Sequence, residues 1–499
     1  MSVGALRTNF IINVFGAVVP LAVALVTVPI YVRHIGDARY GVLSLVWTLL
    51  GYFGFLDLGL SRAASNALAR LREAPREARA RVLVTSLALN LAFGLFGGVI
   101  LAAAGGYLMQ HALTVPEALK PEIVSALPWI AALLPLALAS GVGIGALESR
   151  ERFLLANILQ ICGGSLGQIA PVLLAVLVSP SLAVVIPAAA TARALTVVAI
   201  MIAVYRAEGP LSIADFDRRQ IKTLLSYGGW VTVSSLMSPI LSEFDQFVIG
   251  SLLGVAAITH YIVPMNLVMR SQILAAALSR TLFPRMSSLA RDDAHSLAAR
   301  ALVSLAYGYG AVCAPAIILT PTFFRYWISA DFAAVASPVA EILFFGAWIN
   351  GLAFVPFGLL QSQGRPDVTG KFHAAELLPF VAVLWAMTSA YGIVGAAIAW
   401  SLRCAIDALC LFWAPGIPAS ALLRALPLPL LLLAASAAAA NAIGPNLWPA
   451  IGAAIAAEAA AIALALVMAH DLRTLARTTA RRGLRAIGLA RADLPARAN

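Results

Sequence analysis

Long apolar runs alternate with short polar segments along nearly the whole chain of 499 residues. A helix that crosses the hydrocarbon core of a bilayer needs about 20 apolar residues. The pattern predicts an all-α polytopic membrane protein with about fourteen transmembrane helices. The expected spans are 9–31, 41–66, 82–109, 123–147, 154–178, 182–205, 225–252, 259–284, 301–320, 337–360, 372–391, 393–414, 421–441 and 447–469.

Composition narrows the class of protein. Hydrophobic residues make up 61% of the chain and charged residues only 11%, whereas soluble domains carry about a quarter of charged residues. The polar segments are too short for a catalytic domain, and no G-x-x-x-x-G-K-[ST] run is present to bind ATP. We therefore expect a membrane protein that is not an enzyme and needs no cofactor.

Basic residues are distributed unevenly between the two sides of the predicted spans. Of the 34 basic residues, most fall on the side that holds both termini. The opposite side has only Arg33, Arg39, Lys120 and Arg325, and four more lie within spans. By the positive-inside rule, both termini are predicted to be cytoplasmic. The net charge of +11 is then explained by basic residues on the cytoplasmic side of the membrane. We therefore expect no nucleic-acid partner.

Two stretches of the chain show weak internal similarity. The segment 9–66 ends near Ser61-Arg62, and the segment 225–284 contains Ser279-Arg280 at a comparable position. A duplicated bundle or shared hydrophobicity alone would explain this. The duplication predicts an N-terminal lobe, a cytoplasmic linker, a C-terminal lobe, two further spans and a basic tail, at 1–205, 206–224, 225–414, 415–470 and 471–499. The tail either binds anionic lipid or only fixes the topology.

Several short motifs resemble those of a known family. They are PIYVRHIGDARYG at 29–41, GYFGFLDLGLSR at 51–62, YGGW at 227–230, SP at 238–239, DQFVIG at 245–250, Y-x-x-P at 261–264 and LFP at 282–284. Together they resemble the start of each half of bacterial polysaccharide transporters, the Wzx-like flippases of lipid-linked oligosaccharides.

The resemblance implies the multidrug/oligosaccharidyl-lipid/polysaccharide exporter fold, with two six-helix lobes in a V, two additional C-terminal helices and alternating access. It implies a bacterial inner-membrane protein that carries an undecaprenyl-diphosphate-linked repeat unit of O-antigen, capsule or exopolysaccharide to the outer leaflet. The expected partners are this substrate and membrane lipids. Contact with the polysaccharide polymerase and chain-length machinery is a further expectation.

Arginines within the predicted spans are candidates for binding a lipid diphosphate. A charged side chain at mid-bilayer costs about 2.5–3.5 kcal/mol on insertion scales and usually faces a cavity or a partner. The planar guanidinium matches phosphate oxygens. We predict that Arg193, Arg270 and Arg280, with Arg62 at the cavity mouth, bind the diphosphate. The alternative is structural neutralisation, which we favour for Arg403 because Asp407 lies four residues later on the same helix.

Three membrane acids are candidates for ion coupling or gating: Asp245, Glu243 and Asp57. One of them would bind H⁺ or Na⁺, or Glu243 or Asp245 would form a salt bridge with Arg270. Asp57 has Ser61 and Arg62 nearby as structural partners. The six histidines are scattered along the sequence, and we expect no metal site.

Other functions remain as alternatives. Export of a peptidoglycan-precursor lipid is compatible with the composition. A drug or cation antiporter of the same fold would need an acidic cavity and usually has twelve spans. A membrane glycosyltransferase would need a large outer loop, which the short predicted outer loops do not provide.

Overall fold

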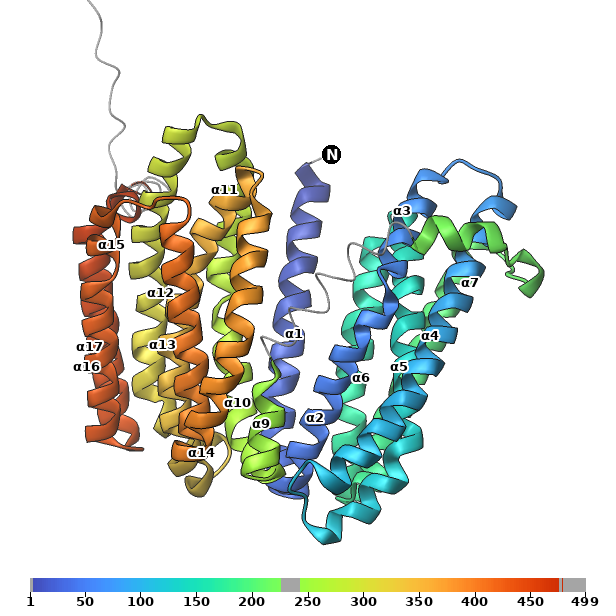
Figure 1. Ribbon diagram of the computed structural model, residues 1–499, viewed down its shortest axis with the longest axis horizontal. Helices are drawn as coiled ribbons and strands as arrows, with labels where there is room; N and C mark the ends of the chain where they lie inside the picture. Colours follow the sequence, from blue (N-terminus) through green and yellow to red (C-terminus); the bar gives the residue numbers. More distant parts are fainter. Residues whose placement is uncertain (1–2, 226–242, 475–477, 479–499) are drawn as a thin grey trace, which may run out of the picture. The chain divides into compact units, whose positions relative to one another are not determined.

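The computed structural model describes residues 3–225, 243–474 and 478, and these described residues are helical with no strand. Figure 1 shows long helices running side by side within each of two compact units. Unit 1 comprises Met1–Ile262 and unit 2 comprises Val263–Asn499. The predicted fold class, an all-α polytopic membrane protein, is confirmed.

In the described residues of unit 1, long α-helices are joined by shorter α- and 3₁₀-helices, and α10 continues into unit 2. Their bounds are α1 (Val3–Ile35), α2 (Asp37–Phe53), η1 (Gly54–Asp57), α3 (Leu60–Arg70), α4 (Arg76–His111), η2 (Glu117–Leu119), α5 (Lys120–Ser149), α6 (Phe153–Leu177), α7 (Leu182–Glu208), η3 (Ile213–Asp215), α9 (Asp245–Leu252) and α10 (Val255–Ser271).

Unit 2 begins within α10, and its described residues continue with α11 to α17. These are α11 (Ile273–Ser288), α12 (Arg291–Trp327), α13 (Ala330–Ser362), α14 (Pro366–Trp413), α15 (Ala419–Ala425), α16 (Pro427–Ile443) and α17 (Leu447–Met468). Trp348 of α13 is fully buried, and its indole N–H donates to the Ala306 carbonyl of α12 at 3.0 Å. This bond satisfies the polar atom of a large core side chain.

Among the described residues, 11 helices are long and apolar enough to cross a membrane. The helix α14 is one of them, and it covers two predicted spans because its backbone turns at Gly392, where φ is 60° and ψ is −144°. Glycine adopts this left-handed region without a steric penalty, at the residue where the sequence predicts a turn. The predicted span 225–252 falls largely on residues 226–242, outside the described residues, so the total of fourteen stays a prediction.

The predicted span 41–66 is not one continuous helix. It divides into α2, η1 and α3, because Leu58 (φ 47°) and Gly59 (φ 69°) both adopt left-handed backbone conformations. Such residues cannot continue a right-handed helix. The chain therefore breaks directly after Asp57.

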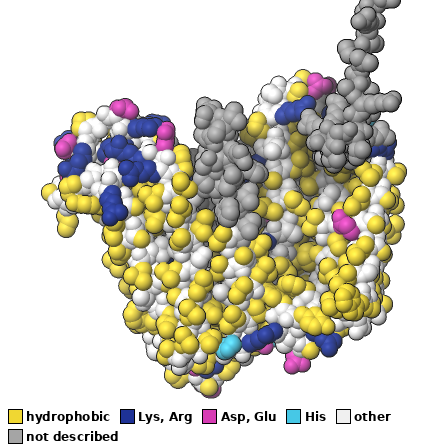
Figure 2. All heavy atoms as spheres, turned by 180° about the vertical axis from the view of Figure 1, so that it is seen from behind, with side chains coloured by type: hydrophobic (Ala, Val, Ile, Leu, Met, Phe, Trp, Pro, Cys, Tyr) yellow, Lys and Arg dark blue, Asp and Glu magenta, His cyan; other side chains and the backbone are white. Residues whose placement is uncertain are grey.

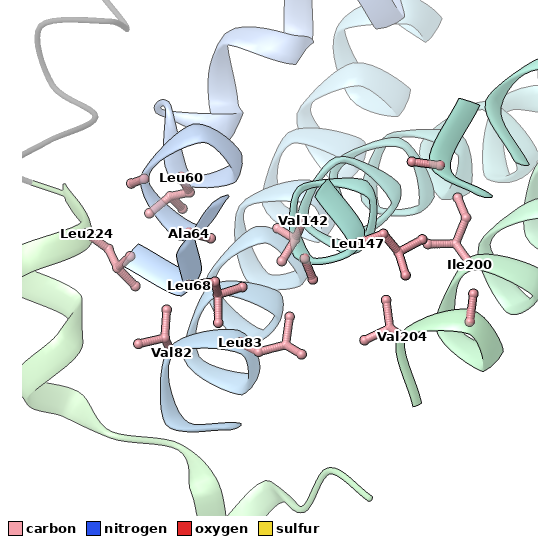
Figure 3. Close-up of a cluster of buried hydrophobic side chains, with 14 residues drawn as sticks. Leu60, Ala64, Leu68, Val82, Leu83, Val142, Leu147, Ile200, Val204 and Leu224 are labelled. Atoms are coloured by element: carbon pink, nitrogen blue, oxygen red, sulfur yellow. The ribbon is translucent and has the colours of Figure 1, made fainter. Parts of the chain in front are cut away.

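Glycines in α5 allow three helices of unit 1 to approach closely. A β-carbon on Gly141 would lie 2.8 Å from Ser61 Oγ, and one on Gly143 would lie 2.4 Å from Ile200 Cγ2. The G-x-G-x-G sequence at 141–145 therefore serves helix packing. Figure 3 shows the apolar cluster formed there by side chains of α3, α4, α5 and α7, with Leu60, Val142, Leu147 and Val204 among its fully buried members.

Charged side chains gather at one end of unit 1. Figure 2 shows Lys and Arg concentrated at this end, whereas apolar side chains cover most of the surface below it. We call it the arginine-rich end. It includes Arg150, whose Nη1 donates to the Arg72 carbonyl, and the buried Arg79, which shares the Glu208 carboxylate with Arg150. This separation of charged ends from an apolar belt is the arrangement expected of a protein embedded in a bilayer.

Candidate functional site

Arginines that lie within the candidate spans fall into two classes, those bound to a carboxylate and those that are not. Arg193 belongs to the second class. It lies near the middle of α7 and is half-buried, and its Nη2 donates to Ser140 Oγ of α5 at 3.2 Å. Among the described residues of unit 1, no acidic side chain forms an ion pair with it. Where α5 packs against α7, the Arg193 cation thus has a neutral hydroxyl as its observed partner.

Arg39 and Arg79 show how the first class is arranged. The Arg39 guanidinium binds both oxygens of Glu122, at 2.9 and 2.6 Å, and Glu122 also accepts the backbone N–H of Leu182 at 2.8 Å. The Arg79 guanidinium binds both oxygens of Glu208, with Nε 2.7 Å from Oε2. These arginines are neutralised by bidentate carboxylates and join helices within unit 1.

Glu208 also accepts both hydrogen bonds of a second arginine at the arginine-rich end. The Arg150 Nε and Nη2 atoms each lie 3.0 Å from a Glu208 oxygen. These hydrogen bonds raise the pKa of the Arg150 guanidinium above its ordinary value. One carboxylate therefore joins α4 and the segment after α5 to the end of α7.

Arg62 and Asp57 lie on either side of the break between η1 and α3. The Asp57 carboxylate accepts the Ser61 backbone N–H at 3.1 Å and the Ser61 hydroxyl at 2.5 Å, which places a negative charge at the N-terminus of α3. The exposed Arg62 forms no ion pair among the described residues of unit 1. Ser61 is thus the partner that Asp57 binds directly.

Arg270 and Arg280 lie within one candidate span, Val255–Ser288, but on two helices. The helix α10 ends at Ser271, and α11 begins at Ile273. Both side chains are exposed, and neither forms a hydrogen bond or ion pair within the described part of unit 2.

The four predicted diphosphate-binding arginines are divided between the two units. Arg62 and Arg193 belong to unit 1, and Arg270 and Arg280 belong to unit 2. Their convergence on one cavity stays a prediction, as does the division of the chain at 206–224.

The two neighbouring acids of the predicted span 225–252 differ in their surroundings. Asp245 is buried at the start of α9, where it accepts the Tyr261 hydroxyl at 2.5 Å and the Gln246 backbone N–H at 2.8 Å. Glu243 is half-buried and forms no hydrogen bond or ion pair among the described residues. Asp245 thus has a structural partner, whereas no described residue hydrogen-bonds to the Glu243 carboxylate.

Arg403 is neutralised, but by a different acid from the one expected. Its Nη1 lies 3.2 Å from Glu376 Oε1, and its guanidinium lies over the Phe380 ring at 5.5 Å from the centroid. Asp407 is instead 3.8 Å from His373. The predicted Arg403–Asp407 pair is wrong because the turn at Gly392 brings the preceding segment of α14 alongside, which supplies Glu376.

His373 and Glu376 were not among the residues that we predicted to be functional. Their signal in the sequence is the spacing His373-Ala-Ala-Glu376, which places both side chains on one face of a helix. The structure brings them together with Asp407, and their carboxylate and imidazole atoms lie within 4.8 Å of one another.

Comparisons with known proteins address the whole architecture. Residues 6–290 match the family model described as "Polysaccharide biosynthesis protein". A Shigella flexneri protein described as an O-antigen transporter is 28% identical over 411 residues, which cover 81% of this chain and 96% of that protein.

Solved structures share the fold. The lipid II flippase MurJ, in an inward closed conformation, gives a TM-score of 0.68 at 14% identity and covers 93% of this chain and 98% of its own. A multidrug resistance MATE family transporter of the MOP superfamily, in an inward-facing conformation, gives 0.66 at 19% identity, covering 82% of this chain and 100% of its own. At these identities the likeness shows the fold alone.

Proposed function

The chain belongs to the polysaccharide biosynthesis protein family, and from this premise we propose that it is a flippase for lipid-linked oligosaccharides. Its substrate is an undecaprenyl-diphosphate-linked repeat unit of O-antigen, capsule or exopolysaccharide. The protein carries it from the cytoplasmic to the outer leaflet of a bacterial inner membrane by alternating access. The O-antigen transporter of Shigella flexneri, which aligns with most of this chain, supports this class of substrate.

The observation that carries the proposal is the position of Arg193 without a carboxylate. Burying part of an arginine inside an apolar bundle is costly unless an anion or a cavity compensates the charge. Elsewhere in unit 1 the buried arginine Arg79 is neutralised by Glu208. Among the described residues, Arg193 hydrogen-bonds only to the Ser140 hydroxyl, so it remains able to bind two oxygens of a diphosphate.

Arg62, Arg270 and Arg280 supply the remaining positive charge in this proposal. All three are exposed and lack an ion pair within the described residues of their own unit. A diphosphate that moves between membrane faces needs cations at several depths that replace its hydration. The three arginines would bind the headgroup before or after Arg193 binds it.

Coupling to an ion gradient is assigned to Glu243. Of the three candidate acids, Asp57 binds Ser61 and Asp245 binds Tyr261, so both have structural partners. Glu243 has none among the described residues and would bind H⁺ or Na⁺ during the cycle. In the alternative, Glu243 or Asp245 forms a salt bridge with Arg270 and does not bind an ion.

Two other transport functions share the fold. The likeness to MurJ favours a peptidoglycan-precursor lipid as the second candidate substrate, because its headgroup is also anionic. The likeness to a multidrug transporter raises a drug or cation antiporter as a third. An unneutralised arginine in the bundle disfavours a cationic substrate, since like charges repel.

Complementation of a bacterial strain that lacks its O-antigen flippase tests the proposal. Arg193→Gln and Arg270→Gln are expected to abolish surface glycan while the protein accumulates in the membrane at the wild-type level. Arg300→Gln is the matched control, because Arg300 is an exposed arginine whose nearest acid, Asp471, lies 3.8 Å away. Normal glycan display by the Arg193 and Arg270 variants would contradict the assignment.

A further inference from the structure

A pocket in unit 2 lies against both arms of the α14 hairpin, residues 366–391 and 393–413. Its volume is about 260 Å³, and most of its lining is apolar, from side chains such as Phe372, Pro379 and Ile406. The charged lining residues are Glu376, Arg403 and Asp407. A small polar group within an apolar pocket is typical of a ligand site.

The polar group has the donor atoms of a metal site. His373 and Glu376 project from one arm, three residues apart and therefore from the same helix face, and Asp407 projects from the other arm. The candidate ligand atoms of all three lie within 4.8 Å of one another. His373 Nε2 is 3.8 Å from Asp407 Oδ1, too far for a direct hydrogen bond.

Asp407 provides an independent indication that a ligand belongs there. Its exposed fraction is 7%, and its Oδ1 atom has no hydrogen-bond partner among the described residues. Burying a carboxylate oxygen without a partner is unfavourable unless a cation or a donor approaches it. This oxygen lies 3.8 Å from His373 Nε2, and a cation bound between the two atoms would satisfy it.

The charge of the group decides the class of ligand. Arg403 donates to Oε1 of Glu376 and offsets one carboxylate. With both carboxylates ionised and His373 neutral, the four side chains carry one net negative charge. The group therefore attracts a cation and repels an anion. One imidazole nitrogen and two carboxylates suit first-row transition ions such as Zn²⁺, whereas Mg²⁺ and Ca²⁺ prefer oxygen ligands alone.

We propose that His373, Glu376 and Asp407 bind one divalent transition-metal ion that joins the two arms of α14. Small side-chain movements bring the three ligand atoms to about 2.0–2.2 Å from a zinc ion. The metal replaces the missing partner of Asp407 and stabilises the hairpin. This inference does not depend on the proposed substrate.

Zinc binding by the full-length protein in detergent, after removal of bound metal, tests the site. Isothermal titration should show one Zn²⁺ per chain, and Zn²⁺ should raise the Tm. In His373→Ala and Asp407→Asn, the affinity should fall by at least about tenfold and the Tm increase should disappear. His373 is partly exposed, so its alanine variant should fold even if the Asp407 variant does not.

A histidine next to an acid elsewhere in unit 2 provides the control. His470 lies 3.7 Å from Asp471, and the described residues offer this pair no third ligand, so His470→Ala should bind Zn²⁺ as the wild type does. Arg403→Gln should bind Zn²⁺ more tightly if it folds, because a repelling charge has been removed. Absence of zinc binding by the wild type, or equal binding by the His373 and His470 variants, would overturn the proposal.

Discussion

At the scale of single residues, the arginines differ in the partner that each one binds. Arg39, Arg79 and Arg403 each bind a carboxylate, whereas Arg193 binds a hydroxyl. Pairs of the first kind hold helices, or the two arms of α14, together. An arginine without an acid retains its capacity to bind an anionic substrate.

The Arg79–Glu208 pair should contribute strongly to folding, because both side chains are almost fully buried, at 1% and 2% exposure. Glu208→Gln leaves the Arg79 charge uncompensated and should lower the free energy of unfolding by about 3–5 kcal/mol. Thermal denaturation in detergent measures the effect. Glu151→Gln removes an exposed pair with Arg72 and should change stability by less than about 1 kcal/mol. Equal Tm values for the two variants would refute the assignment of a structural role.

The sequence allowed the membrane charges to be identified, but not their partners. Asp407 was a reasonable partner for Arg403 by helical spacing, yet the structure pairs Arg403 with Glu376, 27 residues earlier. The spacing rule describes an isolated helix. Which residues face one another across a helical hairpin depends on its packing, which the spacing of one helix does not determine.

At the scale of elements, glycines set how closely helices approach. In the α14 hairpin, a β-carbon on Gly395 would lie 1.9 Å from the Met387 carbonyl oxygen, a backbone atom that cannot move aside cheaply. In α17, by contrast, nothing lies within 4 Å of a β-carbon on Gly452. The hairpin therefore depends on the absence of a side chain at residue 395.

Gly395→Ala should destabilise the protein by about 1–3 kcal/mol, the usual effect of overpacking. Gly452→Ala should be neutral or stabilise by up to about 1 kcal/mol, because alanine favours a helix more than glycine does. Unfolding in detergent compares the two variants. A Gly395→Ala protein as stable as the wild type would show that the two arms do not approach closely.

Element boundaries were predictable where the sequence carried an obvious turn residue. Gly392 ends one arm of α14 at the predicted position. The break after Asp57 was not predicted, because an apolar run continues through Leu58 and Leu60. There the positive φ of Leu58 and the hydrogen bond from the α3 backbone to Asp57 interrupt the helix. Neither feature can be predicted from hydrophobicity alone.

At the scale of the whole molecule, the sequence established the membrane class and the family. Fourteen apolar runs and few charges predicted an all-α membrane protein, and short motifs indicated polysaccharide transporters. The family match over residues 6–290 confirms that family. The position of one unit against the other depends on residues far apart in the sequence, so hydropathy does not determine it.

The most direct test of the central claim is substrate translocation by the purified full-length protein in liposomes. A fluorescent undecaprenyl-diphosphate oligosaccharide is placed in the inner leaflet, and its appearance outside is measured. Wild type and Arg300→Gln should translocate it equally. Arg193→Gln should be slower by about tenfold or more, since a hydrogen bond between charged groups contributes about 1.5–3 kcal/mol. Translocation by Arg193→Gln at the wild-type rate would contradict a diphosphate site at this arginine.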